Sequence, residues 1–480
     1  MPLHDLRSFL DESDKLGELK VIRGADPHLE IGAISELCLD QDGPALLFDD
    51  IPGYPAGYRV AVNVTSSKRR ALLALGMDTE MPEEEVPSKF QKIYDAYKQV
   101  PPKYVETGPV MENVQTGDDV DLLQFPVPFW HELDGGKYIG TGLGVIQRDP
   151  DTGEVNVGAY RVQLQNRNTL TIFSEPDSDG RGIMEKHWSR GESCPVAITF
   201  GPEPLLFLSA CSTTGSPRRW KEEYEYTGYL AGEPVPVIKG PVTGLPISAG
   251  SEIVIEGEIP PPDKESMVEG PFAEWTGYYE FSSTPEPVIH VKALYYRNDP
   301  ILYGAPPFKH DKHYVFPIQI RSAGLISKFQ QMEIPVRRIW DFRPLGATVF
   351  AIEQQAPDDV TRLMDELEKT HVMSRMMIVV DHDVDIKNPM DVFWAMGTRF
   401  DPEQARTSIV DSRWLLDPMR PIADRESRRA LPYKRLIING CRPFDRLNDF
   451  PPVNRFSEER RKETWEKWNM ADWAIPTPTE

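Results

Sequence analysis

The chain has 480 residues, of which 40% are hydrophobic and 27% charged, a composition typical of a globular protein. At about 150 residues per domain, this length predicts about two to four domains. The formal net charge of −22 argues against nucleic acid or an anionic membrane surface as the main partner. It does not exclude an anionic small substrate, because a local site can be basic within an acidic protein.

The first residues and the cysteines indicate the compartment. The sequence starts with a charged amphipathic stretch without the apolar segment of a signal peptide, and no run of about 18 apolar residues follows. The cysteines are scattered and form no C-x-x-C pair, which argues against a zinc cage or a disulfide framework. We therefore expect a cytoplasmic protein that spans no membrane.

The N-terminal part predicts mixed α/β structure. Asp5 can cap a helix whose apolar face carries Leu6, Phe9 and Leu10. The runs "PALLFDD" and "YRVAVNV" predict strands, and "SSKRRALLALGM" predicts a helix. The first turn of that helix is basic, which is unfavourable for the helix dipole, so we expect its charges to serve another purpose.

From about residue 110 to 300, short β-rich segments recur between Pro and Gly turns, a spacing that predicts a sheet or barrel domain. These segments are "GTGLGVIQRDP", "VNVGAYRVQLQ", "TLTIFS", "CPVAITFG", "PLLFLSA", "SEIVIEGEI" and "PVIHVKALYYR". Beyond about residue 330, "DDVTRLMDELEKTH" predicts a helix, "RMMIVVD" a buried strand and "NPMDVFWAMGTRF" another helix, which together indicate an α/β domain. The tail helix carries Trp465, Trp468 and Trp473, and we expect it to pack on a neighbour such as another subunit.

Two ligand-binding motifs are incomplete. "GTGLG" fails to complete G-x-G-x-x-G because Val145 holds the last position, so we interpret it as a strand turn. "DHDVD" starts like a calcium loop, but Ile386 and Val392 stand where the loop needs Gly and Glu.

The stretch "FKHDKHYVF" contains His310 and His313, with Lys309 and Lys312 beside them. Two neighbouring cations disfavour a metal site. We interpret the stretch as a basic loop that faces solvent or substrate.

Three segments of the β-rich region combine into a candidate site: "NVGAYR", "EEYEYTGYLAG" and "VEGPFAEWTGYYE". Arg161 can bridge two carboxylates, and Glu269 and Glu274 lie five residues apart. If the guanidinium is fixed on one acid, the other can hold and release a proton as a general acid. Asn156 and Glu223 add hard oxygen ligands that suit Mg²⁺ or Mn²⁺ with phosphate. Each of these residues alone would be an ordinary polar residue on the protein surface, so the hypothesis depends on all of them together.

The three segments together resemble the UbiD family of decarboxylases, which use prenylated FMN (prFMN). "RVAVNVTSSKRRALLALG", "DHDVDIKNPMDVFWAMGTRFDP" and "LPYKRLIINGCRPFD" resemble the same family, so the likeness covers nearly the whole chain. It implies an α/β multidomain protein with an N-terminal α/β domain over residues 1–110. A central split β-barrel of the flavin-reductase type, which binds the cofactor, would span 111–315. A C-terminal α/β oligomerisation domain, ending in a helix, would span 316–480.

The resemblance also implies roles for single residues. Glu269, Arg161 and Glu274 match the family's catalytic network, in which Glu274 would be the proton donor. Arg161 also matches the arginine that binds the cofactor, and Lys434 matches a lysine on the cofactor phosphate. The backbone of Ala159 and Tyr160 would face the cofactor.

The metal site departs from the family pattern. Asn156 and Glu223 match two ligands, but the loop "SEPDSDGRGI" lacks the histidine that completes the site in many members. Ser178 or Asp179 falls near that place, and we assign Asp179, which would make an oxygen-only site for Mn²⁺ or Mg²⁺, with K⁺ as a further candidate ion. Alternatively, the metal keeps only Asn156, Glu223 and phosphate.

The implied activity is non-oxidative decarboxylation through a covalent bond between substrate and cofactor, reversible under high CO₂. Trp275 follows Glu274 and favours a flat aromatic or heteroaromatic acid, which the sequence does not identify further. A flavin prenyltransferase would supply the cofactor, and the family forms homo-dimers or homo-hexamers. Two alternatives remain: a carboxylase-complex subunit or cofactor-binding protein that needs partner subunits, and, more weakly, a flavin reductase, for which no nucleotide fingerprint is found.

Overall fold

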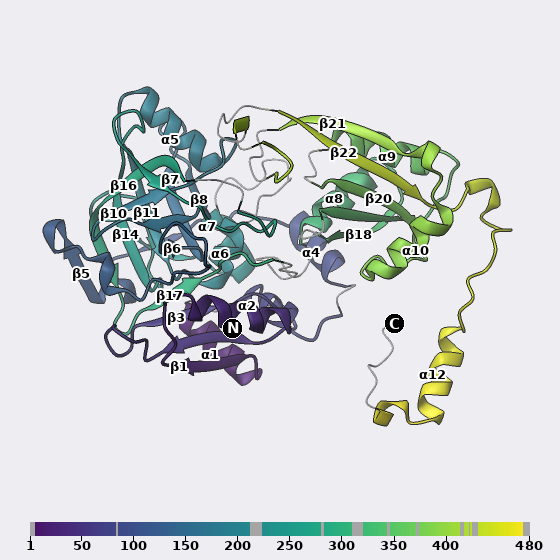
Figure 1. Ribbon diagram of the computed structural model, residues 1–480, viewed down its shortest axis with the longest axis horizontal. Helices are drawn as coiled ribbons and strands as arrows, with labels where there is room; N and C mark the ends of the chain where they lie inside the picture. Colours follow the sequence, from purple (N-terminus) through teal and green to yellow (C-terminus); the bar gives the residue numbers. More distant parts are fainter. Residues whose placement is uncertain are drawn as a thin grey trace.

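The structure is a computed structural model that describes residues 5–82, 85–211, 223–279, 283–309, 320–342, 346–370, 374–412, 417–421, 423–424 and 431–473. Figure 1 shows the N-terminal and central sheets together on one side of the molecule and the C-terminal sheet in a separate lobe. The mixed α/β multidomain architecture that the sequence predicts is confirmed.

The N-terminal sheet has the strand order β1-β2-β3-β17, so its last strand comes from much later in the chain. Its strands are β1 (Leu19–Arg23), β2 (Ala45–Asp49), β3 (Arg59–Val62) and β17 (Ile301–Gly304). The helices of this region are α1 (Leu6–Lys15), α2 (Glu30–Asp40), α3 (Lys68–Ala74) and α4 (Val86–Asp95). The predicted cap is confirmed, since the Asp5 carboxylate accepts a hydrogen bond from the backbone N–H of Ser8 at 2.8 Å.

The basic first turn of α3 has a structural use. Arg70 is buried, and its guanidinium donates to the Glu18 carboxylate at 2.6 Å and to the carbonyls of Asn63 and Val64 at 3.1 Å each. These bonds satisfy the buried Arg70 cation and connect α3 to the sheet. They offset the unfavourable interaction of the Arg70 charge with the dipole of α3.

The central sheet has ten strands and curls into a half-barrel, with the path β6-β9-β10-β16-β14-β11-β7-β8 and both β15 and β5 paired to β16. Its strands are β5 (Asn113–Thr116), β6 (Tyr138–Gly140), β7 (Leu143–Arg148), β8 (Val155–Gly158), β9 (Val162–Leu164), β10 (Thr169–Ile172), β11 (Cys194–Phe200), β14 (Ile253–Ile259), β15 (Ser266–Glu269) and β16 (Thr284–Tyr296). The helices are α5 (Asp179–Ser189), α6 (Pro204–Ala210) and α7 (Glu223–Ala231). A small sheet of β4 (Lys103–Val105), β12 (Pro236–Lys239) and β13 (Pro246–Ser248) lies beside it.

One predicted strand is wrong. "PLLFLSA" forms helix α6 and not a strand. Gly201 takes a positive φ of 110° and turns the chain after β11, and Pro204 then occupies the first helical turn, where its missing N–H costs nothing. A short apolar run without β-branched residues fits a buried helix as well as a strand.

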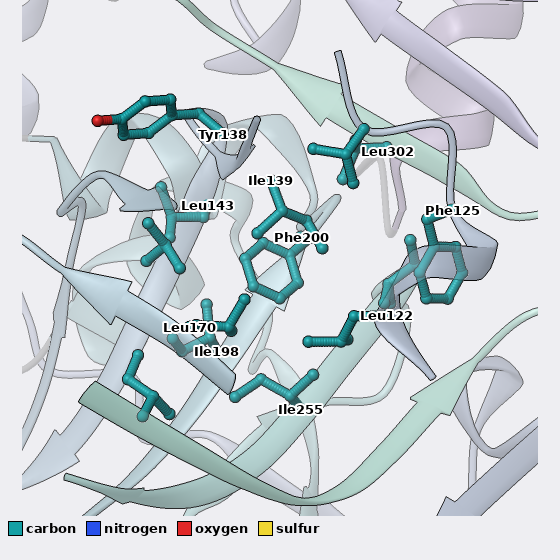
Figure 2. Close-up of a cluster of buried hydrophobic side chains, with 14 of the residues drawn as sticks. Leu122, Phe125, Tyr138, Ile139, Leu143, Leu170, Ile198, Phe200, Ile255 and Leu302 are labelled. Carbon is teal, nitrogen blue, oxygen red and sulfur yellow. The ribbon is translucent and has the colours of Figure 1, made fainter. Parts of the chain in front are cut away.

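Figure 2 shows the core that the half-barrel encloses, with Phe200 among aliphatic side chains from several strands. Tyr138 lies at the edge of this cluster, and its hydroxyl is directed away from the other labelled side chains. The core therefore fixes the ring of Tyr138 while its polar end remains available to the site described below.

The C-terminal sheet has the order β18-β19-β20-β22-β21. Its strands are β18 (Val336–Phe342), β19 (Ala347–Ile352), β20 (Met376–Asp381), β21 (Arg406–Ser412) and β22 (Leu431–Gly440). Its helices are α8 (Ile320–Gln331), α9 (Asp359–Lys369) and α10 (Pro389–Arg399). In the rejected calcium motif, Asp381 and Asp383 instead bind the guanidinium of Arg399.

Helix α12 (Glu458–Lys467) reaches away from the C-terminal lobe in Figure 1. Trp468 and Trp473, just beyond it, are 57% and 55% exposed. Across the described ranges, no helix combines the length and the apolar character needed to cross a membrane.

Candidate active site

The centre of the site is the guanidinium of Arg161, which lies between β8 and β9. It donates from Nε and Nη2 to the two oxygens of Glu269, at 2.9 and 2.8 Å, and from Nη1 to Oε1 of Glu274. All three side chains are almost completely removed from solvent. The structure therefore brings together the two acids and the arginine that the sequence placed in one group.

The two acids lie on different backbone structures. Glu269 ends strand β15. Glu274 opens a tight turn, in which its own N–H donates to the carbonyl of Tyr278 at 3.0 Å and its carbonyl accepts from Gly277 N–H at 2.8 Å. We call residues 273–279 the Glu274 hairpin, because Ala273 and Tyr279 pair as an antiparallel bridge at its base.

The charges of this group are unequal, because two carboxylates share one cation. Burial raises the pKa of the Glu274 carboxyl above its ordinary value, and the Arg161 guanidinium counteracts this only in part. Burial alone would lower the pKa of Arg161, but the neighbouring carboxylates of Glu269 and Glu274 raise it. Glu269 receives two bonds from Arg161 and Glu274 only one, so Glu274 is the acid better able to hold a proton.

Aromatic side chains hold this group in place. Tyr138 donates its hydroxyl to Oε1 of Glu269 at 2.6 Å, and burial together with that carboxylate raises the pKa of Tyr138, which keeps the hydroxyl protonated. The Phe173 ring centroid lies 4.2 Å from the Arg161 Cζ. The Phe272 ring packs on Tyr138 with centroids 3.9 Å apart. Sequence reasoning missed these three rings, since single aromatic residues carry no spacing signal.

A second polar group lies where β8, α5 and α7 meet. The Glu223 carboxylate accepts from the backbone N–H of Val157 at 2.7 Å, which places it beside Asn156. The Tyr160 hydroxyl accepts from Gly180 N–H at 3.0 Å, which connects the loop after β8 to the first turn of α5.

Buried polar atoms in this region lack partners among the described residues, namely Nδ2 of Asn156, Oε1 of Gln147 and Oγ of Ser174. Buried polar atoms of this kind call for a ligand or ordered water. The oxygens of Asn156 and Glu223 suit a hard divalent cation, so the donor set fits a metal and phosphate group.

Among the residues that the structure describes, the other predicted site residues make no hydrogen bond or ion pair with the Arg161 group or with the Asn156–Glu223 group. Asp179 is exposed at the start of α5, and in the described ranges it makes no hydrogen bond or ion pair to Asn156 or Glu223. Ala159 is partly buried against the hydrophobic cluster that contains Phe207 and Tyr303, whereas Lys434 is exposed on β22 in the C-terminal sheet. Their assignments stay predictions.

The aromatic residues after Glu274 differ in burial. Trp275 is half-buried, and Tyr278 is 60% exposed. The sequence, an aromatic run after a polar turn, favours a core role for Tyr278 and Tyr279, and this prediction is wrong for Tyr278. Lys309 lies against the Glu274 hairpin, since a Cβ at Gly277 would approach its Cγ to 3.2 Å. His310, Lys312 and His313, the rest of the predicted basic loop, lie outside the described residues.

Three family models match the chain. They are the N-terminal domain, the Rift-related domain and the C-terminal domain of 3-octaprenyl-4-hydroxybenzoate carboxy-lyase, over residues 10–87, 103–310 and 336–438. The chain is 33% identical to pyrrole-2-carboxylic acid decarboxylase of Pseudomonas aeruginosa, over 92% of this chain and 91% of the relative. It is 32% identical to phenolic acid decarboxylase of Streptomyces, over 88% of this chain and 93% of that relative.

Solved structures show the same fold. An evolved dimeric form of the UbiD-class enzyme HmfF from Pelotomaculum thermopropionicum, in complex with prFMN, matches with a TM-score of 0.79 and 25% identity over 95% of this chain and 98% of that one. The likeness extends over all three parts of the chain, and the buried Glu269–Arg161–Glu274 group lies inside the part that matches the central family model. This chain therefore belongs to the UbiD family of carboxy-lyases.

Proposed function

We propose that this chain is a prFMN-dependent decarboxylase of an aromatic or heteroaromatic carboxylic acid, with Glu274 as the proton donor. The observation that carries the proposal is the buried Arg161 guanidinium, bonded to two carboxylates of which only one is doubly held. Such a group keeps one acid ionised and leaves the other free to exchange a proton.

Decarboxylation of a carboxylate consumes one proton, because RCOO⁻ and H⁺ become RH and CO₂. Bound prFMN would supply the electron sink, through a covalent bond to the substrate, since loss of CO₂ from an sp² carbon needs one that side chains lack. Glu274 delivers the proton to the carbon that carried the carboxyl group. Its raised pKa keeps the proton available near neutral pH, and Arg161 and Glu269 hold its carboxyl in place.

We propose Arg161, Lys434 and the backbone of Ala159 and Tyr160 as the cofactor contacts. The oxygens of Asn156 and Glu223, with Asp179, would hold Mn²⁺ or Mg²⁺ between the chain and the cofactor phosphate, and K⁺ is a further candidate ion. The orphaned Nδ2 of Asn156 is a hydrogen-bond donor, so it supports an acceptor such as a phosphate oxygen at this place. Metal content measured on Asn156→Ala and Asp179→Asn tests the ligand set: a ligand's loss should lower the bound metal, and full occupancy would remove that residue from the set.

The substrate class follows from the relatives and from the aromatic surroundings of the site. The two relatives described above are named for pyrrole-2-carboxylic acid and phenolic acids. Two rings lie beside the Arg161 guanidinium, those of Phe173 and Phe272, and the half-buried Trp275 directly follows Glu274. Aromatic surroundings of this kind suit a flat ring substrate. The reverse carboxylation at high CO₂ belongs to the same proposal.

We propose that the active form is a homo-dimer or homo-hexamer. Trp468 and Trp473, next to α12, are exposed in the single chain. Large exposed aromatic residues commonly mark a protein interface. A second subunit covering α12 would bury them.

The protein co-expressed with a flavin prenyltransferase provides the test. The purified chain, without partner proteins, should show the absorbance of a bound flavin and release CO₂ from at least one acid in a panel of pyrrole, furan, phenolic and benzoic acids. A chain that binds the flavin but needs an added subunit for CO₂ release would contradict the proposal and favour a complex subunit. A flavin-loaded chain that oxidises NAD(P)H and releases no CO₂ would indicate a reductase.

A further inference from the structure

A turn before strand β6 contains a buried carboxylate that the proposed chemistry does not use. The side chain of Asp134 is fully buried, and it accepts from the backbone N–H of His131 at 3.0 Å. The Nδ1 of His131 lies 3.1 Å from the same carboxylate. A carboxylate removed from water needs donors of this kind, so His131 contributes to making the burial of Asp134 tolerable.

This turn is attached to the Glu274 hairpin at both of its arms. On the first arm, the N–H of Ala273, the residue before Glu274, donates to Oδ1 of Asp134 at 3.4 Å. On the second arm, the Tyr279 hydroxyl accepts from the backbone N–H of Leu133 at 3.3 Å. Glu274 lies between these two attachments, so its backbone is held from both sides by residues 131–135.

The backbones of the two segments also touch directly. Gly135 N–H donates to the carbonyl of Pro271 at 2.7 Å. A Cβ at Gly135 would lie 1.8 Å from the carbonyl oxygen of Gly270, so only glycine allows this approach. A shift of the turn would therefore be transmitted to the segment that connects Glu269 to Glu274.

The imidazole acts through one of its two nitrogens. Nδ1 faces the Asp134 carboxylate, which favours the tautomer with the proton on Nδ1. Nε2 is buried, and no described residue bonds it. The ring lies among those of Phe272, Tyr279 and Phe308, with centroids 5.4 to 6.5 Å away, two of which belong to the segment around Glu274.

We propose that His131 and Asp134 are positioning residues, which fix the Glu274 hairpin and so set the place of the Glu274 carboxyl relative to Arg161. The inference rests on the proposed function. A displacement of about 1 Å at a reacting group costs about 100-fold in rate. Since the pair acts through the Glu274 hairpin, its loss should reduce kcat and change KM little.

Three substitutions of His131 separate the two ends of the imidazole. His131→Asn places an amide N–H near the position of Nδ1 and retains the bond to Asp134. His131→Gln places its amide near Nε2 and loses that bond, and His131→Phe keeps only the ring. The matched control is His290→Asn, because His290 bonds the Glu265 carboxylate at 2.8 Å on the surface, away from the hairpin.

The prFMN-loaded enzyme and the most active acid of the panel serve for the assay. We expect His131→Phe and His131→Gln to lose about 100-fold in kcat with KM changed less than about threefold, while His131→Asn stays near wild type. Activity in His131→Gln but not in His131→Asn would show that Nε2 acts on the ligand and would overturn the proposal. Wild-type kcat in His131→Phe would also overturn it.

Hydrogen exchange of the amides in residues 271–279 gives a readout that does not depend on activity. His131→Phe should speed exchange there and His131→Asn should not; equal exchange in both would refute the positioning role. If the His131 variants fold poorly, Asp134→Asn takes their place, because it removes the charge and keeps one oxygen acceptor. Its kcat should fall to the same extent, and an unchanged kcat would refute the positioning role. If the wild-type enzyme itself releases no CO₂, the proposed function fails, whereas the exchange result still decides the inference.

Discussion

Replacing Tyr138 by phenylalanine tests whether the buried acid–arginine group works as a unit. The substitution removes one hydroxyl, which donates to Glu269 at 2.6 Å, and leaves the packed ring in place. Tyr295→Phe is a matched control, because Tyr295 is equally buried and donates to the carboxylate of Glu256 at 2.7 Å, outside the site. A hydrogen bond to a charged group contributes about 1.5–3 kcal/mol, so both variants should lose about that much free energy of unfolding in urea.

Only Tyr138→Phe should affect turnover. Without the phenol donor, the negative charge of Glu269 is compensated by Arg161 alone, and this charge disfavours the ionised form of Glu274. The pKa of Glu274 therefore rises further, so the loss of kcat with rising pH should begin at higher pH in the variant. Glu269 also holds Arg161, and through it Glu274, less firmly in the variant. We expect kcat near neutral pH to fall about tenfold, which corresponds to about 1.4 kcal/mol. Equal kcat and equal pH profiles in Tyr138→Phe and Tyr295→Phe would refute this coupling.

Three further predictions concern other parts of the chain. Arg161→Ala should reduce both bound flavin, measured by absorbance, and CO₂ release, because it leaves Glu269 and Glu274 buried without their cation; unchanged flavin content would separate Arg161 from cofactor binding. Burial raises the pKa of Glu203 to about 8, so the folded state holds its proton more tightly than the unfolded state and stability is lost as pH rises towards 8. Urea unfolding should therefore show Glu203→Gln gaining stability over wild type between pH 5 and pH 8, and a constant difference would contradict this. Removal of residues 453–480, which carry the exposed Trp468, should give a smaller assembly by light scattering, and an unchanged mass would place the subunit contact elsewhere.

The fold could be predicted where periodicity and capping agree. The N-cap at Asp5, the Asn-Pro start of α10 and most strands of the half-barrel are confirmed, because each has a local physical cause. The run that forms α6 could not be assigned, since seven apolar or small residues suit either a buried strand or a buried helix. Its helix is fixed by Gly201 and Pro204 at its start, together with burial that only the tertiary structure supplies.

The site was predicted where residues of one kind lie close in sequence. Glu269 and Glu274 lie five positions apart, so a shared cation was a reasonable hypothesis. Tyr138 is 131 positions from Glu269, and nothing in its strand marks it as a donor. No sequence pattern indicates the role of the His131–Asp134 turn either, because its contacts to the Glu274 hairpin form only when the two loops meet in the folded protein.

The most direct test of the central claim is deuterium incorporation by the prFMN-loaded enzyme in D₂O. Wild type should exchange or insert deuterium at the carbon that bears the carboxyl group of its substrate, and Glu274→Gln should abolish this while bound flavin remains. Glu185→Gln, an exposed glutamate paired with Arg181, is the matched control and should behave as wild type. Deuterium incorporation at the wild-type rate by Glu274→Gln would show that another group delivers the proton and would contradict the mechanism.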